Sequence, residues 1–372
     1  MAQIICLSST RWLKLPTRTQ WLLTQLNRYH KILFFQPPPS LLSRDPRKND
    51  YKKEGRHPQG NITVYTLPPT FQITNYDHPR LLEQNLKKLT RYITEKAAKA
   101  NFYNPLLWIC SPLYAGLLDT LDYKGIVYDC FQDWPQFDIR WESILANRAD
   151  VLFAASPGLV EHLAPCNTNI ALLPNGCDLK LYTQTEDLTL QVPAPLMRIR
   201  GPLFGYLGDA VRDLDLRPVY RTAKAHPAWS FVFAGRCSRE NPLYQAVHRL
   251  ENVHFLGKIS PLDLPGYAAQ FDVLIDLLET DDPDEDVVPS RIYEYLVVGK
   301  PIAAMYPLRY IPVYSDVIYG AKSPKEFVDA CYQAVMENSA WAPATRKRYG
   351  AEASWVNRAQ EAERILESNG LL

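Results

Sequence analysis

Two separate series of short apolar, β-branched runs alternate with segments of helical periodicity along this chain. Strand, helix and strand in that order predict a parallel sheet with crossover helices. The first series places strands at 3–7, 31–35, 62–65, 106–110, 125–128, 151–154 and 170–173, with helices at 19–29 and from 78 to about 100. The second places strands at 203–207, 230–234, 253–256, 273–277 and 301–305, with helices at 214–226, 242–250, 262–271 and 290–298. The sequence therefore predicts two doubly wound, Rossmann-like α/β domains.

The boundary between the predicted domains lies in a polar, proline-containing stretch. We place the first domain at residues 1–182, the linker at about 183–200 and the second domain at 201–354. The length of 372 residues exceeds what one hydrophobic core usually supports, which agrees with two domains. Ligands of open α/β sheets bind beyond the carboxyl ends of the strands, so we expect the functional site in a crevice there.

Charge is distributed unevenly although the whole chain has a formal net charge of only +1. Residues 1–100 hold 17 Lys and Arg against 6 Asp and Glu, whereas the rest of the chain holds 24 against 34. Two explanations stay open for the basic half: contact with an anionic membrane surface, and solvated helix faces. Because no recognised nucleic-acid motif accompanies the basic residues, we do not expect nucleic acid as a partner.

The cysteines and the apolar segments indicate a cytoplasmic protein without a membrane span. Seven cysteines are scattered with no closely spaced pair, which disfavours a disulfide framework or a zinc site. No basic leader or cleavage site follows Met1. The longest apolar stretch, 105–118, contains Pro112 and is shorter than the ~20 residues that a membrane-spanning helix needs.

Several motifs carry a resemblance to a known family. They are Pro-Asn-Gly-Cys-Asp at 174–178, then 252–257 (NVHFLG), 264–267 (LPGY), 271–273 (FDV) and, most distinctive, 288–301 (VPSRIYEYLVVGKP). In this order they resemble the donor domain of GT-B glycosyltransferases, particularly the large group called group 1 or family 4. The first half is similar to members that build bacterial exopolysaccharide or cell-surface glycan, through 127–133 (VYDCFQD) and the loop 12–20.

The resemblance implies a GT-B fold whose two domains face each other across a cleft, with a C-terminal helix in residues 355–372 that crosses back to the first domain. It implies transfer of a sugar from a nucleotide-diphosphate sugar, a UDP- or GDP-sugar, to a lipid-linked or polysaccharide acceptor at the cytoplasmic membrane face. No tightly bound cofactor and no metal are expected. The seven histidines show no metal-ligand spacing, and no Asp-x-Asp closes a strand.

Two acidic residues of the 288–301 region and its approach are candidates for binding the donor. A carboxylate accepts two hydrogen bonds from a vicinal diol, so Glu294 suits the ribose. The resemblance implies an acidic contact to the sugar eight positions earlier, where this chain has Asp286 in place of the usual Glu. Tyr293 lies in the same segment and is assigned to donor binding with it.

Cations and glycines near strand ends are candidates for the diphosphate and the base. Arg291 follows Pro289 in the first turn of a helix, where a cation opposes the helix dipole unless it meets an anion. Arg212 and Arg236 follow strand ends and either bind the diphosphate or pair with neighbouring acids. Gly208 allows close backbone approach, and the resemblance places the nucleobase near Gly257.

The acceptor side is expected around the strand at 125–128. Asp133 and Asp129 follow it, and apolar surroundings that include Trp134 suit a general base of raised pKa if the reaction inverts configuration. A helix cap or loop hydrogen bond is the alternative for Asp133. The loop residues Trp12, Arg18 and Gln20 are assigned to acceptor binding, with Trp12 and Trp134 as sugar-stacking platforms.

Two other functions fit the same fold. A GT-B nucleotide-sugar epimerase would need more acid and base residues in the crevice and no acceptor. A non-catalytic partner subunit would keep the fold and lose donor residues, and Asp286 in place of Glu is the one feature that favours it. Nucleotide binding that depends on Glu294 would distinguish a transferase from a non-catalytic partner subunit.

Overall fold

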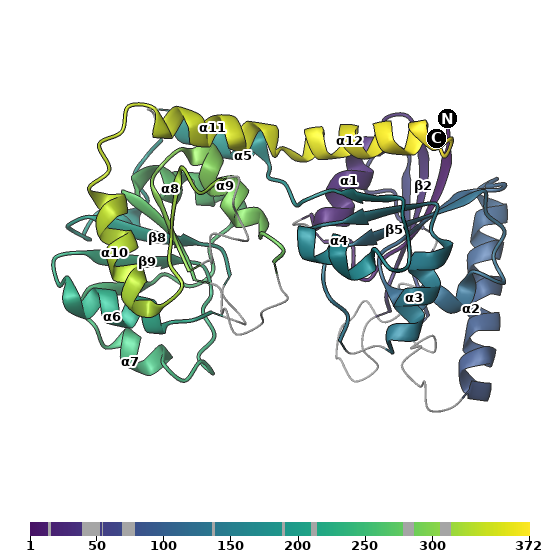
Figure 1. Ribbon diagram of the computed structural model, residues 1–372, viewed down its shortest axis with the longest axis horizontal. Helices are drawn as coiled ribbons and strands as arrows, with labels where there is room; N and C mark the ends of the chain where they lie inside the picture. The colour runs from purple at the N-terminus through teal and green to yellow at the C-terminus, as the bar shows by residue number, and fades with distance from the viewer. Residues whose placement is uncertain are drawn as a thin grey trace. The chain divides into compact units, whose positions relative to one another are not determined.

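The chain folds into two compact α/β units (Figure 1). The computed structural model describes residues 1–13, 16–38, 53, 55–68, 79–135, 138–187, 190–209, 214–277, 286–305 and 314–372. Unit 1 comprises Met1–Pro174 and Val356–Leu372, and unit 2 comprises Asn175–Trp355. Within the described ranges, no helix is long and apolar enough to cross a membrane.

Unit 1 is built on a seven-stranded parallel sheet in the order β3-β2-β1-β4-β5-β6-β7. Buried aromatic residues such as Phe34, Trp108 and Phe153 fill its core. Its strands are β1 (Gln3–Leu7), β2 (Lys31–Gln36), β3 (Ile62–Thr66), β4 (Leu106–Ile109), β5 (Gly125–Cys130), β6 (Val151–Ala154) and β7 (Ile170–Leu172). Its α-helices are α1 (Arg18–Leu26), α2 (Pro79–Lys99), α3 (Ile139–Arg148), α4 (Pro157–Leu163) and α12 (Trp355–Ser368).

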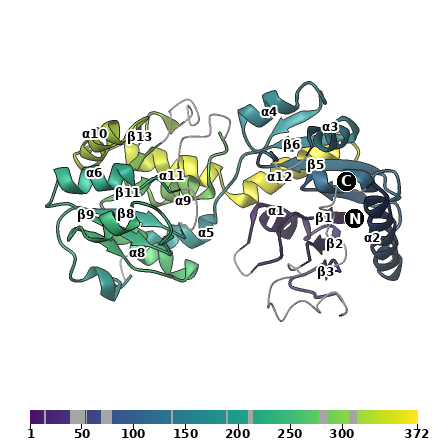
Figure 2. The same ribbon diagram turned by 90° about the horizontal axis from the view of Figure 1, so that it is seen from below.

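Unit 2 repeats this arrangement with a six-stranded parallel sheet in the order β10-β9-β8-β11-β12-β13. Its strands are β8 (Leu203–Leu207), β9 (Ser230–Ala234), β10 (Val253–Phe255), β11 (Val273–Asp276), β12 (Ile302–Ala304) and β13 (Ile318–Gly320). Its α-helices are α5 (Leu179–Tyr182), α6 (Arg217–Ala225), α7 (Tyr244–His248), α8 (Leu264–Gln270), α9 (Ser290–Val298), α10 (Pro324–Val335) and α11 (Ala342–Glu352). Figure 2 shows α6 and α10 on one side of this sheet and α8 on the other.

Both sheets have the order of doubly wound nucleotide-binding folds, in which the chain reverses direction beside the first strand. Each sheet is buried on both faces, so its strands are continuous apolar runs that the sequence shows directly. Gly205 in β8 illustrates the packing, because a Cβ there would lie 1.9 Å from the Phe271 ring. The prediction of two Rossmann-like domains is confirmed.

The division between the units falls at Pro174, earlier than the boundary at 182 expected from the sequence. Backbone hydrogen bonds explain the difference: Cys177 N donates to Ala353 O, and Trp355 N donates to Cys177 O, each at 3.1 Å. The expected linker also contributes to unit 2, because Leu196 is buried in its core. Strand β13 was not predicted. Residues Val356–Leu372, which contain most of α12, belong to unit 1.

Candidate active site

The carboxyl ends of β8, β9 and β11 meet the start of α9 in unit 2. Gly208 follows β8 with φ +96°, and among the described residues no atom lies within 4 Å of a Cβ built there. Gly235 follows β9, where a Cβ would lie 2.0 Å from the Gly208 carbonyl oxygen. These glycines bring two strand ends together, and because Gly208 has no side chain a ligand can approach its backbone closely.

Arg291 is held rigidly in the first turn of α9. Its Nη1 lies 2.8 Å from Asp276 Oδ1, at the end of β11, and its guanidinium lies 4.2 Å from the centre of the Tyr206 ring. Asp276 is fully buried, whereas the Arg291 side chain keeps 18% of its surface exposed. The carboxylate and the ring hold the planar guanidinium at the end of β11, and a guanidinium has the charge and shape that suit an anion such as a diphosphate.

Glu294 lies one turn further along α9 and is half-buried. Burial raises the pKa of its carboxyl and the charge of Asp178 adds to that rise, whereas the nearby Tyr182 hydroxyl and the charge of Arg291 oppose it. A carboxylate in this setting can accept hydrogen bonds from a bound diol. Tyr293, assigned to donor binding from the sequence, instead packs in the core of unit 2, because it lies on the buried face of α9.

The remaining donor candidates lie at other strand ends. Arg236, 60% exposed, pairs with Asp209 through Nη2 to Oδ2 at 2.5 Å, and its backbone N donates to Asp209 Oδ1 at 2.8 Å. Gly257 has φ +73°, and no atom in the described part of the chain lies within 4 Å of a Cβ placed there. Asp286 is half-buried just before α9. Arg212 lies outside the described residues.

In unit 1, the two candidate bases have different environments. Asp129 is fully buried and accepts from Arg18 Nε at 3.0 Å, with Arg18 Nη2 at 2.9 Å from the same oxygen. Arg18 and Asp129 are buried and bind each other. The structure therefore does not present Arg18 to an acceptor, and it does not expose Asp129 as a base. Asp133 lies in the loop after β5 and is half-buried. Of the two, Asp133 fits the role of a base better.

The other acceptor candidates contact residues of their own loops or of β2. Gln20 Oε1 accepts from Leu13 N at 3.1 Å and Thr17 N at 3.2 Å, so its amide organises the start of α1. The Trp12 ring packs edge-on against Phe34 at 5.0 Å, and its backbone N donates to Gln36. Trp134 is half-buried beside Phe131 at 6.2 Å. The structure thus gives Gln20 a role in shaping the loop.

Three polar residues near these sites were missed from the sequence: Asp276, Tyr182 and Glu142. Glu142 is buried on α3, where it accepts from Tyr128 Oη at 2.7 Å and lies 3.0 Å from His162 Nε2. Tyr128 immediately precedes Asp129, so Glu142 stabilises the end of β5. Asp276 directly ends a buried strand, a position at which a carboxylate could have been recognised as functional.

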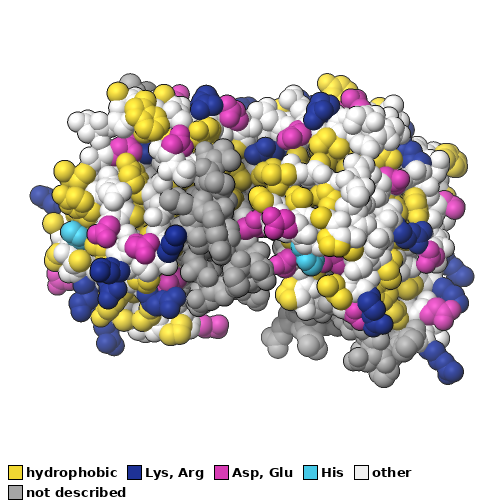
Figure 3. Space-filling model, viewed as in Figure 1, with side chains coloured by type: hydrophobic (Ala, Val, Ile, Leu, Met, Phe, Trp, Pro, Cys, Tyr) yellow, Lys and Arg dark blue, Asp and Glu magenta, His cyan; other side chains and the backbone are white. Residues whose placement is uncertain are grey.

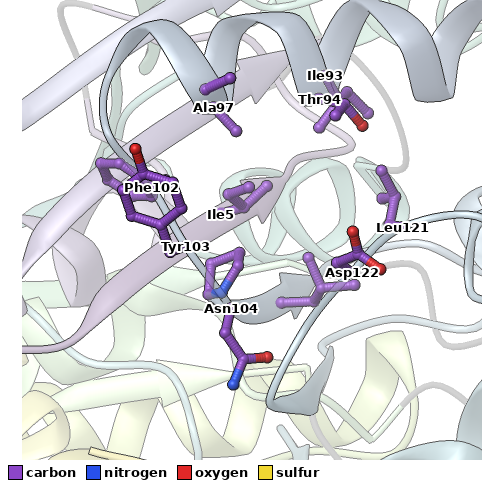
Figure 4. A pocket seen from close by; sticks show the side chains of 12 residues that line it. Ile5, Ile93, Thr94, Ala97, Phe102, Tyr103, Asn104, Leu121 and Asp122 are labelled. Atoms are coloured by element: carbon purple, nitrogen blue, oxygen red, sulfur yellow. The ribbon is translucent and has the colours of Figure 1, made fainter.

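A cavity of about 250 Å³ in unit 1 lies apart from these residues (Figure 4). It opens between α2 and the strands β1 and β4. Its lining is mainly apolar, with Ile5, Ile93, Ala97, Phe102, Leu107 and Leu121. It contains none of the predicted site residues. Among the residues that the structure describes, no group of three His, Cys, Asp or Glu side chains is arranged to hold a metal ion.

Comparisons with known proteins agree with this architecture. No protein-family model matches the sequence. The chain is 22% identical over 266 residues to a curated Bacillus subtilis protein, "Putative teichuronic acid biosynthesis glycosyltransferase TuaH"; the match covers 65% of this chain and 66% of that one, just under two thirds of its length.

Solved structures match over nearly the whole chain. Sucrose-phosphate synthase from Thermosynechococcus elongatus matches with a TM-score of 0.70 and 15% identity over 99% of both chains. HepE from Anabaena, in complex with UDP and glucose, matches with 0.67 and 16% over 99% of this chain and 100% of that one. The fold is therefore GT-B, and the resemblance to glycosyltransferase enzymes of this fold is confirmed.

Proposed function

We propose that this chain transfers a sugar from a nucleotide-diphosphate sugar, with the donor bound by unit 2. Arg291, Gly208 and the first amides of α9 meet the diphosphate, and Glu294 accepts the ribose hydroxyls. The observation that carries the proposal is Arg291, held by Asp276 and Tyr206 at the end of β11, one turn from Glu294. HepE, whose structure is described with UDP-glucose, supports a UDP-sugar donor.

In the proposed reaction an acceptor hydroxyl attacks the anomeric carbon while the bond from that carbon to the diphosphate oxygen breaks. The nucleoside diphosphate leaves with both electrons of that bond, and Arg291 stabilises its charge. If configuration is inverted, Asp133 takes the acceptor proton. An epimerase of this fold would need further acid and base groups around Glu294 and Arg291.

A panel of nucleotides tests the donor proposal. We expect one of UDP, GDP and ADP to raise the midpoint of thermal unfolding, because a ligand at 100 times its Kd stabilises by about 2.7 kcal/mol. Glu294→Ala should abolish the shift, whereas Glu363→Ala on α12 of unit 1 should keep it. Absence of a shift with every nucleotide would favour the non-catalytic partner subunit.

The acceptor is proposed to be lipid-linked or a growing glycan at a membrane surface, with a basic helix face as the membrane contact. On α2, Arg80, Lys88 and Arg91 are exposed, while Lys87 and Lys99 pair with Glu83 and Glu95. Figure 3 shows Lys and Arg side chains, with some acidic ones, along the edge of unit 1 where Figure 1 places α2. Anionic lipid headgroups attract such a face by about 1 kcal/mol per Lys or Arg.

Transfer to a lipid-linked saccharide in phosphatidylglycerol vesicles tests both acceptor-side proposals. Asp133→Asn should lower kcat about 10²- to 10⁴-fold without changing vesicle binding. Lys88→Glu with Arg91→Glu should weaken vesicle binding about 30-fold, the effect of roughly 2 kcal/mol. The control Lys322→Glu with Lys325→Glu makes the same charge change on exposed residues of unit 2 and should bind vesicles normally. Unchanged kcat or unchanged vesicle binding would remove the corresponding assignment.

A further inference from the structure

The neighbouring strands β8 and β11 separate at their carboxyl ends, at the point where the strand order of unit 2 reverses. Both strands lie wholly within the described part of the chain, and they pair at Phe204 with Val273 and at Gly205 with Leu274. Beyond these pairs, each strand continues for two more residues beside its other neighbour, β9 or β12. The backbone groups that face each other across the gap therefore need other partners.

The hydroxyl of Tyr295 supplies those partners. Tyr295 lies on α9, and its side chain is fully buried in the core of unit 2. Its hydroxyl accepts from Leu207 N at 3.0 Å and donates to the Ile275 carbonyl oxygen at 3.1 Å. Leu207 belongs to β8 and Ile275 to β11, so one oxygen atom bridges the two strands. A phenylalanine would fill the same apolar space, so packing alone does not require this hydroxyl.

The two bridged residues immediately precede groups of the proposed donor site. On β8, Leu207 is followed by Gly208, which is proposed to face the diphosphate. On β11, Ile275 is followed by Asp276, whose Oδ1 lies 2.8 Å from Arg291 Nη1. The separation of the two strand ends therefore sets the distance between the glycine backbone and the guanidinium.

We propose that Tyr295 is a positioning residue whose hydroxyl holds β8 and β11 at the separation that a diphosphate needs between Gly208 and Arg291. The inference rests on the proposed donor site and deepens it, because it names the diphosphate as the part of the donor that depends on this separation. Without the hydroxyl, the Leu207 amide and the Ile275 carbonyl either bond directly, which draws the strand ends together, or stay without partners, which leaves their separation unfixed. In both cases the diphosphate loses contacts that the nucleoside does not use.

Replacing Tyr295 with phenylalanine tests the inference. Calorimetry compares wild type and Tyr295→Phe with UDP, GDP and ADP and with the three corresponding nucleosides. We expect Tyr295→Phe to lose about 10-fold in affinity for the diphosphate that wild type binds, the scale of one hydrogen bond, and to keep its affinity for the nucleoside. A residue that only stabilised the fold would change both affinities alike or neither.

A double-mutant cycle shows whether Tyr295 acts through Arg291. We expect Tyr295→Phe to weaken diphosphate binding about 10-fold when Arg291 is present and less than about 2-fold in Arg291→Ala, because that variant has no guanidinium left to position. Equal losses in both backgrounds would overturn the positioning role.

A matched control removes a buried tyrosine hydroxyl elsewhere. Tyr114 in unit 1 donates to the Ser8 carbonyl oxygen at 3.0 Å, and Tyr114→Phe should leave all affinities unchanged. If wild type binds none of the three diphosphates, the proposed donor site itself fails. If wild type binds one of them and Tyr295→Phe binds it equally well, the positioning role is overturned and the donor site stands.

Hydrogen exchange of wild type gives a second measurement that does not depend on the folding of Tyr295→Phe. The Leu207 amide, which donates to the Tyr295 hydroxyl, should exchange far more slowly than an exposed amide in the absence of any nucleotide. Exchange at the rate of an exposed amide would show that the hydroxyl does not hold the two strands, and would overturn the inference.

Discussion

Replacing Arg291 with alanine is expected to lower kcat for sugar transfer about 10²- to 10³-fold. An anion-stabilising donor aimed at charge that develops in the transition state contributes on that scale. The affinity for the nucleoside diphosphate should fall, whereas the affinity for the nucleoside alone should hardly change, because the nucleoside lacks the diphosphate. Steady-state release of nucleoside diphosphate measures kcat. Calorimetry with the nucleoside diphosphate and with the nucleoside measures the two affinities.

Two further variants separate charge from geometry at this position. Arg291→Lys keeps the positive charge but loses the planar group stacked on Tyr206, so we expect it to recover only part of the rate. Asp276→Asn keeps the shape of the partner and removes its charge, and should lower kcat less than Arg291→Ala. An Arg291→Ala enzyme that binds nucleoside and nucleoside diphosphate with unchanged affinities would show that Arg291 is a structural ion pair only.

Removing Arg346 is expected to cost about 3–5 kcal/mol of unfolding free energy, because it leaves a buried charge without its partner. Arg346 on α11 is fully buried and its Nη1 donates to Glu337 Oε1 at 2.9 Å. The same guanidinium donates to the carbonyl oxygens of Val317 at 2.8 Å and Gly299 at 3.2 Å, and Gly299 ends α9. Arg346→Ala should lower the thermal midpoint by about 10 °C in calorimetry.

The double variant Arg346→Met with Glu337→Gln is the control for this effect. It removes both charges, keeps similar volume and leaves an acceptor for the Tyr319 hydroxyl, which lies 3.0 Å from Glu337 Oε2. It should therefore recover most of the stability that Arg346→Ala loses. A midpoint for Arg346→Ala within about 2 °C of wild type would contradict the view that this ion pair stabilises the helix carrying Arg291 and Glu294.

Strands that are buried on both faces were the most predictable part of this protein. Residues 203–207 and 230–234 form strands at the positions expected, because continuous apolar runs between polar loops have few other stable arrangements. The short strand at Ile318–Gly320 was missed, since three residues without a strong pattern give no signal. We predicted a linker at 183–200 because the segment is polar and contains prolines, yet Leu196 within it is buried.

The candidate site was predicted unevenly. Arg291 was assigned from its place in the first turn of a helix, and Glu294 from the segment 288–301 that carries the family resemblance. The structure brings Asp276 to Arg291 and Tyr182 near Glu294. The sequence offered no signal for Tyr182, because it lies far from Glu294 along the chain. Tyr293 was assigned to the site by proximity in sequence, although adjacent helix positions point in different directions.

By itself the sequence determined the class of fold, the order of its elements and the helix that carries the candidate donor residues, since these depend on local periodicity and burial. Only the tertiary structure decided which side chains act together. It paired Arg18 with Asp129, which leaves Asp133 as the more accessible of the two candidate bases, and it paired Arg291 with Asp276. Such contacts join residues far apart in the chain, and their partners are fixed by how the helices pack on the sheets, which no local pattern records.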